Sequence, residues 1–322
     1  MGGQVAWIGL GNMGRGIVKN LVTKAPLSGP LIIYNRTQSR ADSLAATLPK
    51  PVTVAPSIPD AVTPANIIFI CLGDDPAVEE TLATAVQTTN ISGKLFVDCS
   101  TVHPDCTRRA AKLLESHGGS FVACPVFGAA AMAEAGQLVC VLAGKPELIE
   151  RVKPFCAGVM GRANIDLSAL PASRAVGVVD DGSDPAADPG RATMLKIVGN
   201  ALVVHMVEAV AEGMVLAEKS GLGVEALHDL MELLFPGPYV GYASRMRSGD
   251  YYKREEPLFA VDLARKDASH MMDMAGKVGA RLRGVELADE YLKVVREHQG
   301  ERGDIAGIYG AVREEAGLKF EN

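Results

Sequence analysis

VAWIGLGNMG, residues 5–14, is the stretch of sequence that decides the fold. Its apolar start, Val5–Ile8, predicts a short buried strand, and the run Arg15–Val22 after it is typical of a helix. Between them, Gly9, Gly11 and Gly14 form a G-x-G-x-x-G pattern. In such a turn the first glycine permits the tight bend, the second lets a pyrophosphate approach, and the third lets helix and strand pack closely. The pattern predicts a dinucleotide-binding turn made of Gly9, Leu10, Gly11, Asn12, Met13 and Gly14.

Further apolar runs follow the first, separated by connections long enough for helical crossovers. The strands expected after Val5–Ile8 are Leu31–Tyr34, Ile67–Leu72, Leu95–Asp98, Phe121–Cys124 and Val139–Leu142. Strands that alternate with helices indicate an α/β fold with a largely parallel, doubly wound sheet. Beyond residue 190 this pattern stops, and helical segments follow with breaks at 221–223, 236–238 and 300–303.

The sequence therefore predicts three parts. Residues 1–167 form a Rossmann domain, and residues 191–322 form an all-helical domain that begins with a long interdomain helix, Arg191–Glu218. The segment 168–190 between them is a loop or insertion, with turn signals at Asp180-Asp181-Gly182 and Asp188-Pro189-Gly190. A segment this long is either a lid or a surface insertion, and its shortage of large apolar residues favours the insertion.

Composition excludes several classes of protein. The 322 residues are 48% hydrophobic and carry a net charge of −6, and this acid excess argues against a nucleic-acid binder. We expect no signal peptide, because the first apolar run, Val5–Leu10, opens directly into the glycine turn and has no basic segment before it. We expect no membrane span, because the apolar helical run Met194–Leu216 is interrupted by charged and polar residues. The cysteines lack metal-ligand spacing, so we expect reduced core thiols in a cytoplasmic protein and no metal site. They are Cys71, Cys99, Cys106, Cys124, Cys140 and Cys156.

The second motif follows the second expected strand. An NAD enzyme usually places an acidic residue there for the ribose 2′-hydroxyl, but this chain has Asn35, Arg36 and Thr37, with Arg40 one turn later. A guanidinium offers a planar fork that matches phosphate oxygens, so the motif predicts a 2′-phosphate and hence NADP. The alternative is an ordinary solvated cation in a loop.

The third motif runs from Asp98 to Pro104 at the end of a central expected strand, and it contains Ser100 and Thr101. Ligands of open parallel sheets bind beyond the carboxyl ends of strands, so these hydroxyls are candidates for contacts with cofactor and substrate. The alternative is that one of them merely caps the helix that starts at Pro104. Leu72, at the end of its own expected strand, is also assigned to the cofactor site.

The fourth feature is Lys196, the only lysine in the helix Arg191–Glu218, with Asn200 one turn further on the same face. The helix is apolar on nearly every side, as expected for one packed between domains. Burial favours the neutral amine, so Lys196 is a candidate proton donor and acceptor. The alternative is a lysine that extends its charge into solvent past an apolar stem.

These four features, in this order and over nearly the whole chain, resemble the β-hydroxyacid dehydrogenase family. Its members include 3-hydroxyisobutyrate dehydrogenases, glyoxylate and succinic semialdehyde reductases, and 6-phosphogluconate dehydrogenase. The resemblance implies that Ser100 and Thr101 lie beside substrate and nicotinamide, that Lys196 is the general acid/base and that Asn200 helps hold the substrate. It also implies that Lys266, followed by Asp267, reaches the cofactor, and that the helical domain carries substrate contacts and pairs two chains into a homodimer.

The chain departs from the family at the expected substrate site. The family's P-V-S-G-G segment grips a carboxylate, whereas this chain has Pro125-Val126-Phe127-Gly128-Ala129. Backbone donors at Gly128 and Ala129 remain for an anion, but Phe127 replaces the serine hydroxyl with an apolar ring. The substrate is therefore either a small carboxylate or a bulkier, less acidic carbonyl compound.

Together these features predict an NADP(H)-dependent oxidoreductase that transfers a hydride between nicotinamide and a β-hydroxyacid or a related aldehyde or ketone. One alternative is an imine reductase or reductive aminase of the same architecture, although those relatives commonly replace the helix lysine. The other is a non-catalytic NADPH-binding module, which the presence of Lys196, Asn200, Ser100 and Thr101 disfavours.

Overall fold

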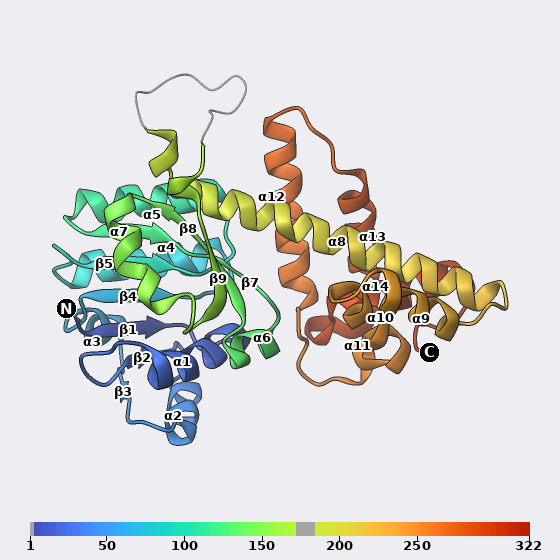
Figure 1. The fold of residues 1–322 in the computed structure, drawn as a ribbon, viewed down its shortest axis with the longest axis horizontal. Helices are drawn as coiled ribbons and strands as arrows, with labels where there is room; N and C mark the ends of the chain where they lie inside the picture. The colour runs from blue at the N-terminus through green and yellow to red at the C-terminus, as the bar shows by residue number, and fades with distance from the viewer. Residues whose placement is uncertain (1–2, 172–183) are drawn as a thin grey trace. The chain divides into compact units, whose positions relative to one another are not determined.

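The computed structural model describes residues 3–171 and 184–322 (Figure 1). The chain divides into two compact units, residues 1–196 and 197–322. Among the described residues, all strands lie in the first unit and the second contains only helices and loops. The turn expected at Asp180–Gly182 lies outside the described residues.

The first unit is built on one sheet, in the order β3-β2-β1-β4-β5-β6-β8-β7 with β9 beside β8. The strands from β3 to β6 are parallel, and β8 runs antiparallel to β6 and β7. The bounds are β1 Val5–Ile8, β2 Ile32–Tyr34, β3 Thr53–Val54, β4 Ile67–Ile70, β5 Leu95–Asp98, β6 Ser120–Ala123, β7 Val126–Phe127, β8 Leu138–Gly144 and β9 Gly161–Asp166.

The expected doubly wound fold is confirmed, because alternate strand residues enter apolar cores on opposite faces of the sheet. Trp7 and Phe69 lie in one core, and Ile8 and Ile68 in the other. Sequence analysis missed three strands. β3 and β7 have only two residues each, and β9 is polar and partly exposed, so neither an apolar run nor clear alternation marks them. The helices are α1 Asn12–Lys24, α2 Gln38–Thr47, α3 Ile58–Val62, α4 Asp75–Thr88, α5 Pro104–Ser116, α6 Ala130–Ala135 and α7 Pro146–Val152.

The register of the central strands determines where the loops emerge. Ile8 of β1 lies beside Tyr34 of β2 and Ile70 of β4, and Ile70 lies beside Asp98 of β5. The carboxyl ends of these parallel strands therefore meet at one edge of the sheet. The segments that follow them are those in which the sequence places the cofactor and hydroxyl motifs.

The helix α8, Gly190–Lys219, agrees with the expected helix at both ends. By length and composition alone it could cross a membrane: the mean hydropathy of its most apolar window is 1.5, and half of that window is buried. The core helix of a soluble protein has the same length and composition.

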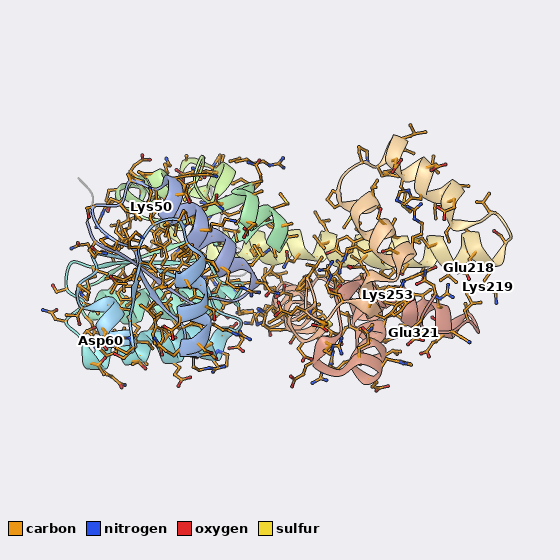
Figure 2. The ribbon with its side chains drawn as sticks, turned by 90° about the horizontal axis from the view of Figure 1, so that it is seen from below. Lys50, Asp60, Glu218, Lys219, Lys253 and Glu321 are labelled. Atoms are coloured by element: carbon orange, nitrogen blue, oxygen red, sulfur yellow. The ribbon has the colours of Figure 1, made fainter. Side chains whose placement is uncertain are left out.

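The second unit packs the later part of α8 with shorter helices around a core that includes Val207, Met214, Tyr251 and Tyr309. Glu218 and Lys219 lie in the last turn of α8 (Figure 2). Polar contacts hold this turn: Glu218 accepts a hydrogen bond from Arg313, and Lys219 Nζ donates to the Ala316 carbonyl at 2.6 Å. The helices are α9 Val224–Leu234, α10 Pro238–Ser248, α11 Asp250–Lys253, α12 Val261–Lys277, α13 Arg283–Gln299 and α14 Ile308–Glu315.

Candidate functional site

The glycine turn after β1 has the shape that a dinucleotide requires. Gly9 has a φ of +103°, and a Cβ there would lie 2.2 Å from the Cys71 carbonyl oxygen. A Cβ at Gly14 would lie 2.1 Å from the Gly9 carbonyl oxygen, whereas a Cβ at Gly11 would meet no described atom within 4 Å. Gly11 is also the N-cap of α1, and as a glycine it places no side chain over the helix N-terminus. Open space beside a helix N-terminus fits a pyrophosphate.

The end of β2 is tied to this turn. The Leu10 amide donates to Asn35 Oδ1 at 2.9 Å, and Asn35 Nδ2 donates to the Thr37 carbonyl at 3.0 Å. Asn35 therefore holds the glycine turn in place, a role that sequence analysis did not assign. The side chains of Arg36, Thr37 and Arg40 are exposed at the start of α2, where an incoming anion has access to them.

Ser100 connects the ends of β4 and β5. Its Oγ accepts a hydrogen bond from the Leu72 amide at 2.8 Å, and its own amide donates to Asp98 Oδ1 at 2.9 Å. The residue is 1% exposed. The capping alternative does not hold for Ser100 or Thr101, because His103 is the N-cap of α5 and its Nδ1 accepts from the Asp105 amide.

Lys196 lies next to the ring that replaces the family serine. Its Nζ is 4.4 Å from the centroid of the Phe127 ring, and the residue is 8% exposed. An ammonium over an aromatic face is attracted by the negative charge of the π system. Gly128 and Ala129, which follow Phe127, are exposed. The structure thus brings together Lys196 and Phe127, two positions that the sequence singled out far apart.

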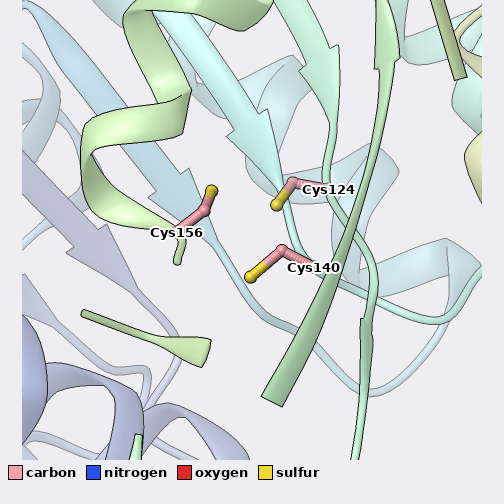
Figure 3. A group of neighbouring side chains, drawn as sticks. All are labelled: Cys124, Cys140 and Cys156. Atoms are coloured by element: carbon pink, nitrogen blue, oxygen red, sulfur yellow. The ribbon is translucent and has the colours of Figure 1, made fainter. Parts of the chain in front are cut away.

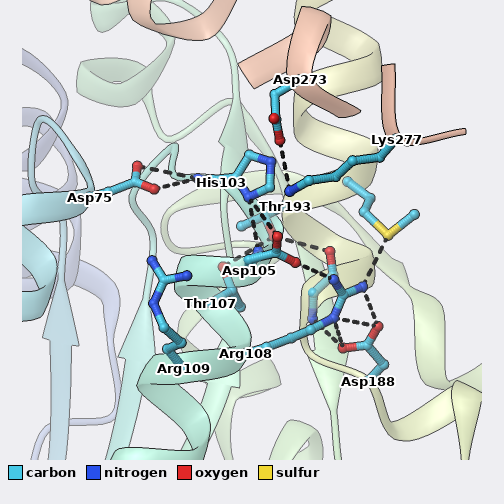
Figure 4. Close-up of polar contacts among 12 residues, drawn as sticks. Asp75, His103, Asp105, Thr107, Arg108, Arg109, Asp188, Thr193, Asp273 and Lys277 are labelled. Atoms are coloured by element: carbon cyan, nitrogen blue, oxygen red, sulfur yellow. Dashed lines mark hydrogen bonds and ion pairs between the residues drawn. The ribbon is translucent and has the colours of Figure 1, made fainter. Parts of the chain in front are cut away.

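The first turns of α8 are held against α5 by polar contacts that sequence analysis missed (Figure 4). The Arg108 guanidinium donates from both Nε and Nη2 to the Asp188 carboxylate, and Thr107 Oγ1 lies 3.1 Å from Thr193 Oγ1. The hydrogen bond to Asp188 raises the pKa of Arg108. Because Thr193 lies one turn before Lys196, these contacts fix the helix turn that carries the lysine. Sequence analysis missed these contacts because Arg108 and Thr193 do not belong to a recognisable motif.

In the second unit, Asn200 and Lys266 meet at one carboxylate. Asn200 Nδ2 donates to Asp267 Oδ2 at 2.6 Å, and Lys266 Nζ lies 3.2 Å from Asp267 Oδ1. Asn200 is 6% exposed and Asp267 2%. The Lys266-Asp267 pair is therefore part of a buried polar group and not the exposed surface pair that helix charge patterns alone suggest. Asp267 orients both side chains.

Comparison with known protein families identifies the class of protein that has this architecture. Residues 4–166 match the NAD binding domain of 6-phosphogluconate dehydrogenase. Residues 190–312 match the family described as NAD-binding of NADP-dependent 3-hydroxyisobutyrate dehydrogenase. With the glycine turn at the sheet edge, these matches define an NAD(P)-binding oxidoreductase. The chain belongs to the β-hydroxyacid dehydrogenase family, with a first domain of the 6-phosphogluconate dehydrogenase type and a second of the 3-hydroxyisobutyrate dehydrogenase type.

Individual relatives extend over the same length. The NADH-dependent oxidoreductase ucdB of Aspergillus ustus is 35% identical over 96% of this chain and 98% of its own. Glyoxylate/succinic semialdehyde reductase 1 of Arabidopsis thaliana is 25% identical over 91% of this chain and 92% of its own. The fold resembles that of Mycobacterium tuberculosis 3-hydroxyisobutyrate dehydrogenase, with a TM-score of 0.75, 24% identity and coverage of 97% and 100% of the two chains.

Proposed function

We propose that this oxidoreductase uses NADP(H) to interconvert a hydroxyl and a carbonyl group on a β-hydroxyacid or a related aldehyde or ketone, with Lys196 as general acid/base. The observation that carries the proposal is the sheltered position of Lys196, 8% exposed with its Nζ 4.4 Å from the Phe127 ring centroid. A titratable amine withdrawn from solvent beside the segment that holds substrate in the family favours proton transfer over a surface role.

The bound nicotinamide would supply or accept the hydride. In the reducing direction Lys196 Nζ donates a proton to the alkoxide oxygen that forms on the substrate carbon. In the oxidising direction the neutral amine takes the hydroxyl proton. By the family resemblance, Ser100, Thr101 and the backbone of Gly128 and Ala129 would position the substrate. Asn200, which Asp267 orients, would bind the substrate oxygen, and Lys266 would contact the cofactor.

The direct test is oxidation of NADPH and of NADH against one panel of carbonyl compounds. It contains glyoxylate, succinic semialdehyde, uncharged aryl and alkyl aldehydes, ketones and a cyclic imine. Turnover of aldehydes or ketones supports the proposal. Tight cofactor binding with no turnover of any compound would contradict it and favour a non-catalytic module.

A second candidate, reduction of an imine, is favoured by one observation: the apolar Phe127 ring replaces a hydroxyl beside Lys196. An apolar wall suits an uncharged imine better than a carboxylate. Cyclic-imine reduction faster than the reduction of every aldehyde and ketone in the panel would replace the first candidate with this one.

The preference for NADP is proposed from Arg36 and Arg40, both exposed after β2 where an acidic residue would favour NAD. Replacement of Arg36 by aspartate is expected to raise the Kd for NADPH by about 10-fold or more, because one charge-assisted hydrogen bond contributes about 1.5–3 kcal/mol. The Kd for NADH should change much less. Fluorescence titration of both cofactors measures the ratio.

The matched control is Arg162→Asp, which makes the same charge change at an exposed position of β9, several strands away from β2 in the sheet. Its cofactor ratio should equal that of the wild type. The relative from Aspergillus ustus is called NADH-dependent, so a wild-type protein that binds NADH as tightly as NADPH would overturn the proposed preference.

Phe127 is proposed to set the substrate class. Replacement by serine restores the hydroxyl of the family pattern and removes the ring from Lys196. We expect kcat/KM for glyoxylate relative to an aryl aldehyde to rise by about 10-fold, because a hydroxyl that bonds a substrate group contributes about 1–1.5 kcal/mol. The Phe127→Leu variant keeps an apolar side chain and should leave this ratio close to that of the wild type. Equal ratios in both variants would remove Phe127 as the determinant.

We also propose that the protein is a homodimer. Large apolar side chains are exposed on the second unit at the end of α8 and in α9, with Leu216 70% exposed and Leu233 86% exposed. Large apolar side chains exposed to water are costly, and a second copy of the chain would cover them. Sedimentation velocity should give twice the 33.9 kDa chain mass, and a monomer at micromolar concentration would contradict the proposal.

A further inference from the structure

Three cysteines from separate segments of the first unit point toward one another (Figure 3). Cys124 directly follows β6, Cys140 lies in β8, and Cys156 directly follows the short 3₁₀ helix Lys153–Phe155. Their Sγ atoms all lie within 4.8 Å of one another, and each of the three residues is 0% exposed. None of them is used by the proposed catalytic chemistry.

The backbone holds these thiols in place. Cys140 pairs with Val126 across β7 and β8, and the Cys124 amide donates to the Asp98 carbonyl at 2.7 Å. The Cys156 amide donates to the Lys153 carbonyl at 3.0 Å, and its Sγ to the Val152 carbonyl at 3.5 Å. The convergence is thus a property of the sheet and its connections, and the site requires little ordering when a ligand binds.

The surroundings of the three sulfurs favour a soft ligand. The cysteines belong to the apolar core that also contains Leu138 and Phe155. A core of this kind offers few oxygen ligands to a hard cation, whereas cysteine sulfur suits a soft one.

The spacing fits coordination by sulfur. A metal–thiolate bond is about 2.3 Å long, so three sulfurs around one ion lie about 4 Å apart, and the observed separations need to close by less than about 1 Å. Thiolates select soft d¹⁰ ions such as Cu(I), Zn(II) and Cd(II) over hard ions that prefer oxygen ligands. Complete burial keeps solvent and substrate away from the ion, so a structural role fits better than a catalytic one, which needs access to the metal.

We propose that Cys124, Cys140 and Cys156 bind one soft d¹⁰ metal ion in the core of the dinucleotide-binding unit. Binding replaces the thiol protons with the metal ion and releases them to solvent. The ion joins the end of β6, the middle of β8 and the segment after the 3₁₀ helix, so it stabilises the native state by binding that state alone.

The experiment uses the full chain with Cd(II) as the probe. Wild type, Cys140→Ala and Cys106→Ala are refolded under reducing conditions with and without Cd(II), so that burial of the site does not block entry. Cys106 is the matched control because it is also 0% exposed but lies in the core on the other face of the sheet. Metal content, ultraviolet thiolate-to-cadmium absorption and the denaturation midpoint are then measured.

The expected result is one Cd(II) per chain, a charge-transfer band and a raised midpoint in wild type and Cys106→Ala, with all three lost in Cys140→Ala. Cys156→Ala should behave like Cys140→Ala, and it serves if the latter fails to fold by circular dichroism. Wild type that refolds in Cd(II) without retaining it overturns the proposal. So does Cd(II) retained in both cluster variants.

Discussion

Replacement of Lys196 by methionine is expected to lower kcat by about 10²–10⁴-fold, the contribution of a positioned general acid/base. The side chain keeps its length and loses its proton, so the alkoxide or hydroxyl of the substrate has no partner for proton transfer. Single-turnover mixing of enzyme, NADPH and the best substrate of the panel measures the chemical step directly. The Kd for NADPH should stay within about 2-fold of the wild type, because the cofactor turn lies on other elements.

Two controls separate lost chemistry from lost structure in this variant. Lys219→Met makes the same change on the same helix, at a lysine that bonds the Ala316 carbonyl, and it should keep near-wild-type kcat. The free energy of unfolding of Lys196→Met should not fall by more than about 2 kcal/mol, the upper range of a cation–π contact. If Lys196→Met turns over at more than one-tenth of the wild-type rate, Lys196 is not the general acid/base.

Alanine at Gly11 is expected to weaken cofactor binding, whereas alanine at Gly14 is expected mainly to lower stability. A Cβ at Gly11 meets no described atom within 4 Å, so Gly11→Ala should cost only about 1 kcal/mol, the typical effect of alanine at an N-cap. The new methyl group occupies the space where a pyrophosphate approaches, so the Kd for NADPH should rise by at least about 10-fold. Chemical denaturation and cofactor titration of the same sample measure both quantities.

Gly14→Ala should instead destabilise the fold itself. Its Cβ would lie 2.1 Å from the Gly9 carbonyl oxygen, which is backbone and has little freedom to move, so we expect a loss of about 1–3 kcal/mol or more in the free energy of unfolding. Equal loss of stability in Gly11→Ala and Gly14→Ala would mean that both glycines are structural. The interpretation that Gly11 lets the cofactor pyrophosphate come close to the backbone would then be wrong.

Local patterns in the sequence account for most of the fold. The six expected strands, the change to helices beyond residue 190 and the ends of α8 are all confirmed. Each depends on an apolar periodicity or a breaker residue, and both can be recognised within a short stretch of consecutive residues. The residues of the turn between β1 and α1 are equally local, and their conformation follows from the glycines that occupy it.

The strands that sequence analysis missed are those without a local signal. β7 has two residues and β9 is partly exposed, and both exist because β8 offers them backbone partners. Their formation depends on where β8 lies, which no short window encodes. The domain limits at 167 and 191 remain predictions, and the contact-based division falls at Lys196.

The candidate site also has features that the sequence determines and features that only the fold determines. The sequence by itself determined which residue types stand in the glycine turn, after β2 and on α8, because motif and periodicity are properties of neighbouring residues. Only the tertiary structure decided that Asn35 holds the glycine turn, that Phe127 lies against Lys196, and that Cys124, Cys140 and Cys156 share one point in the core. Contacts between residues so distant in the chain depend on strand register and helix packing, which form only when the whole unit folds.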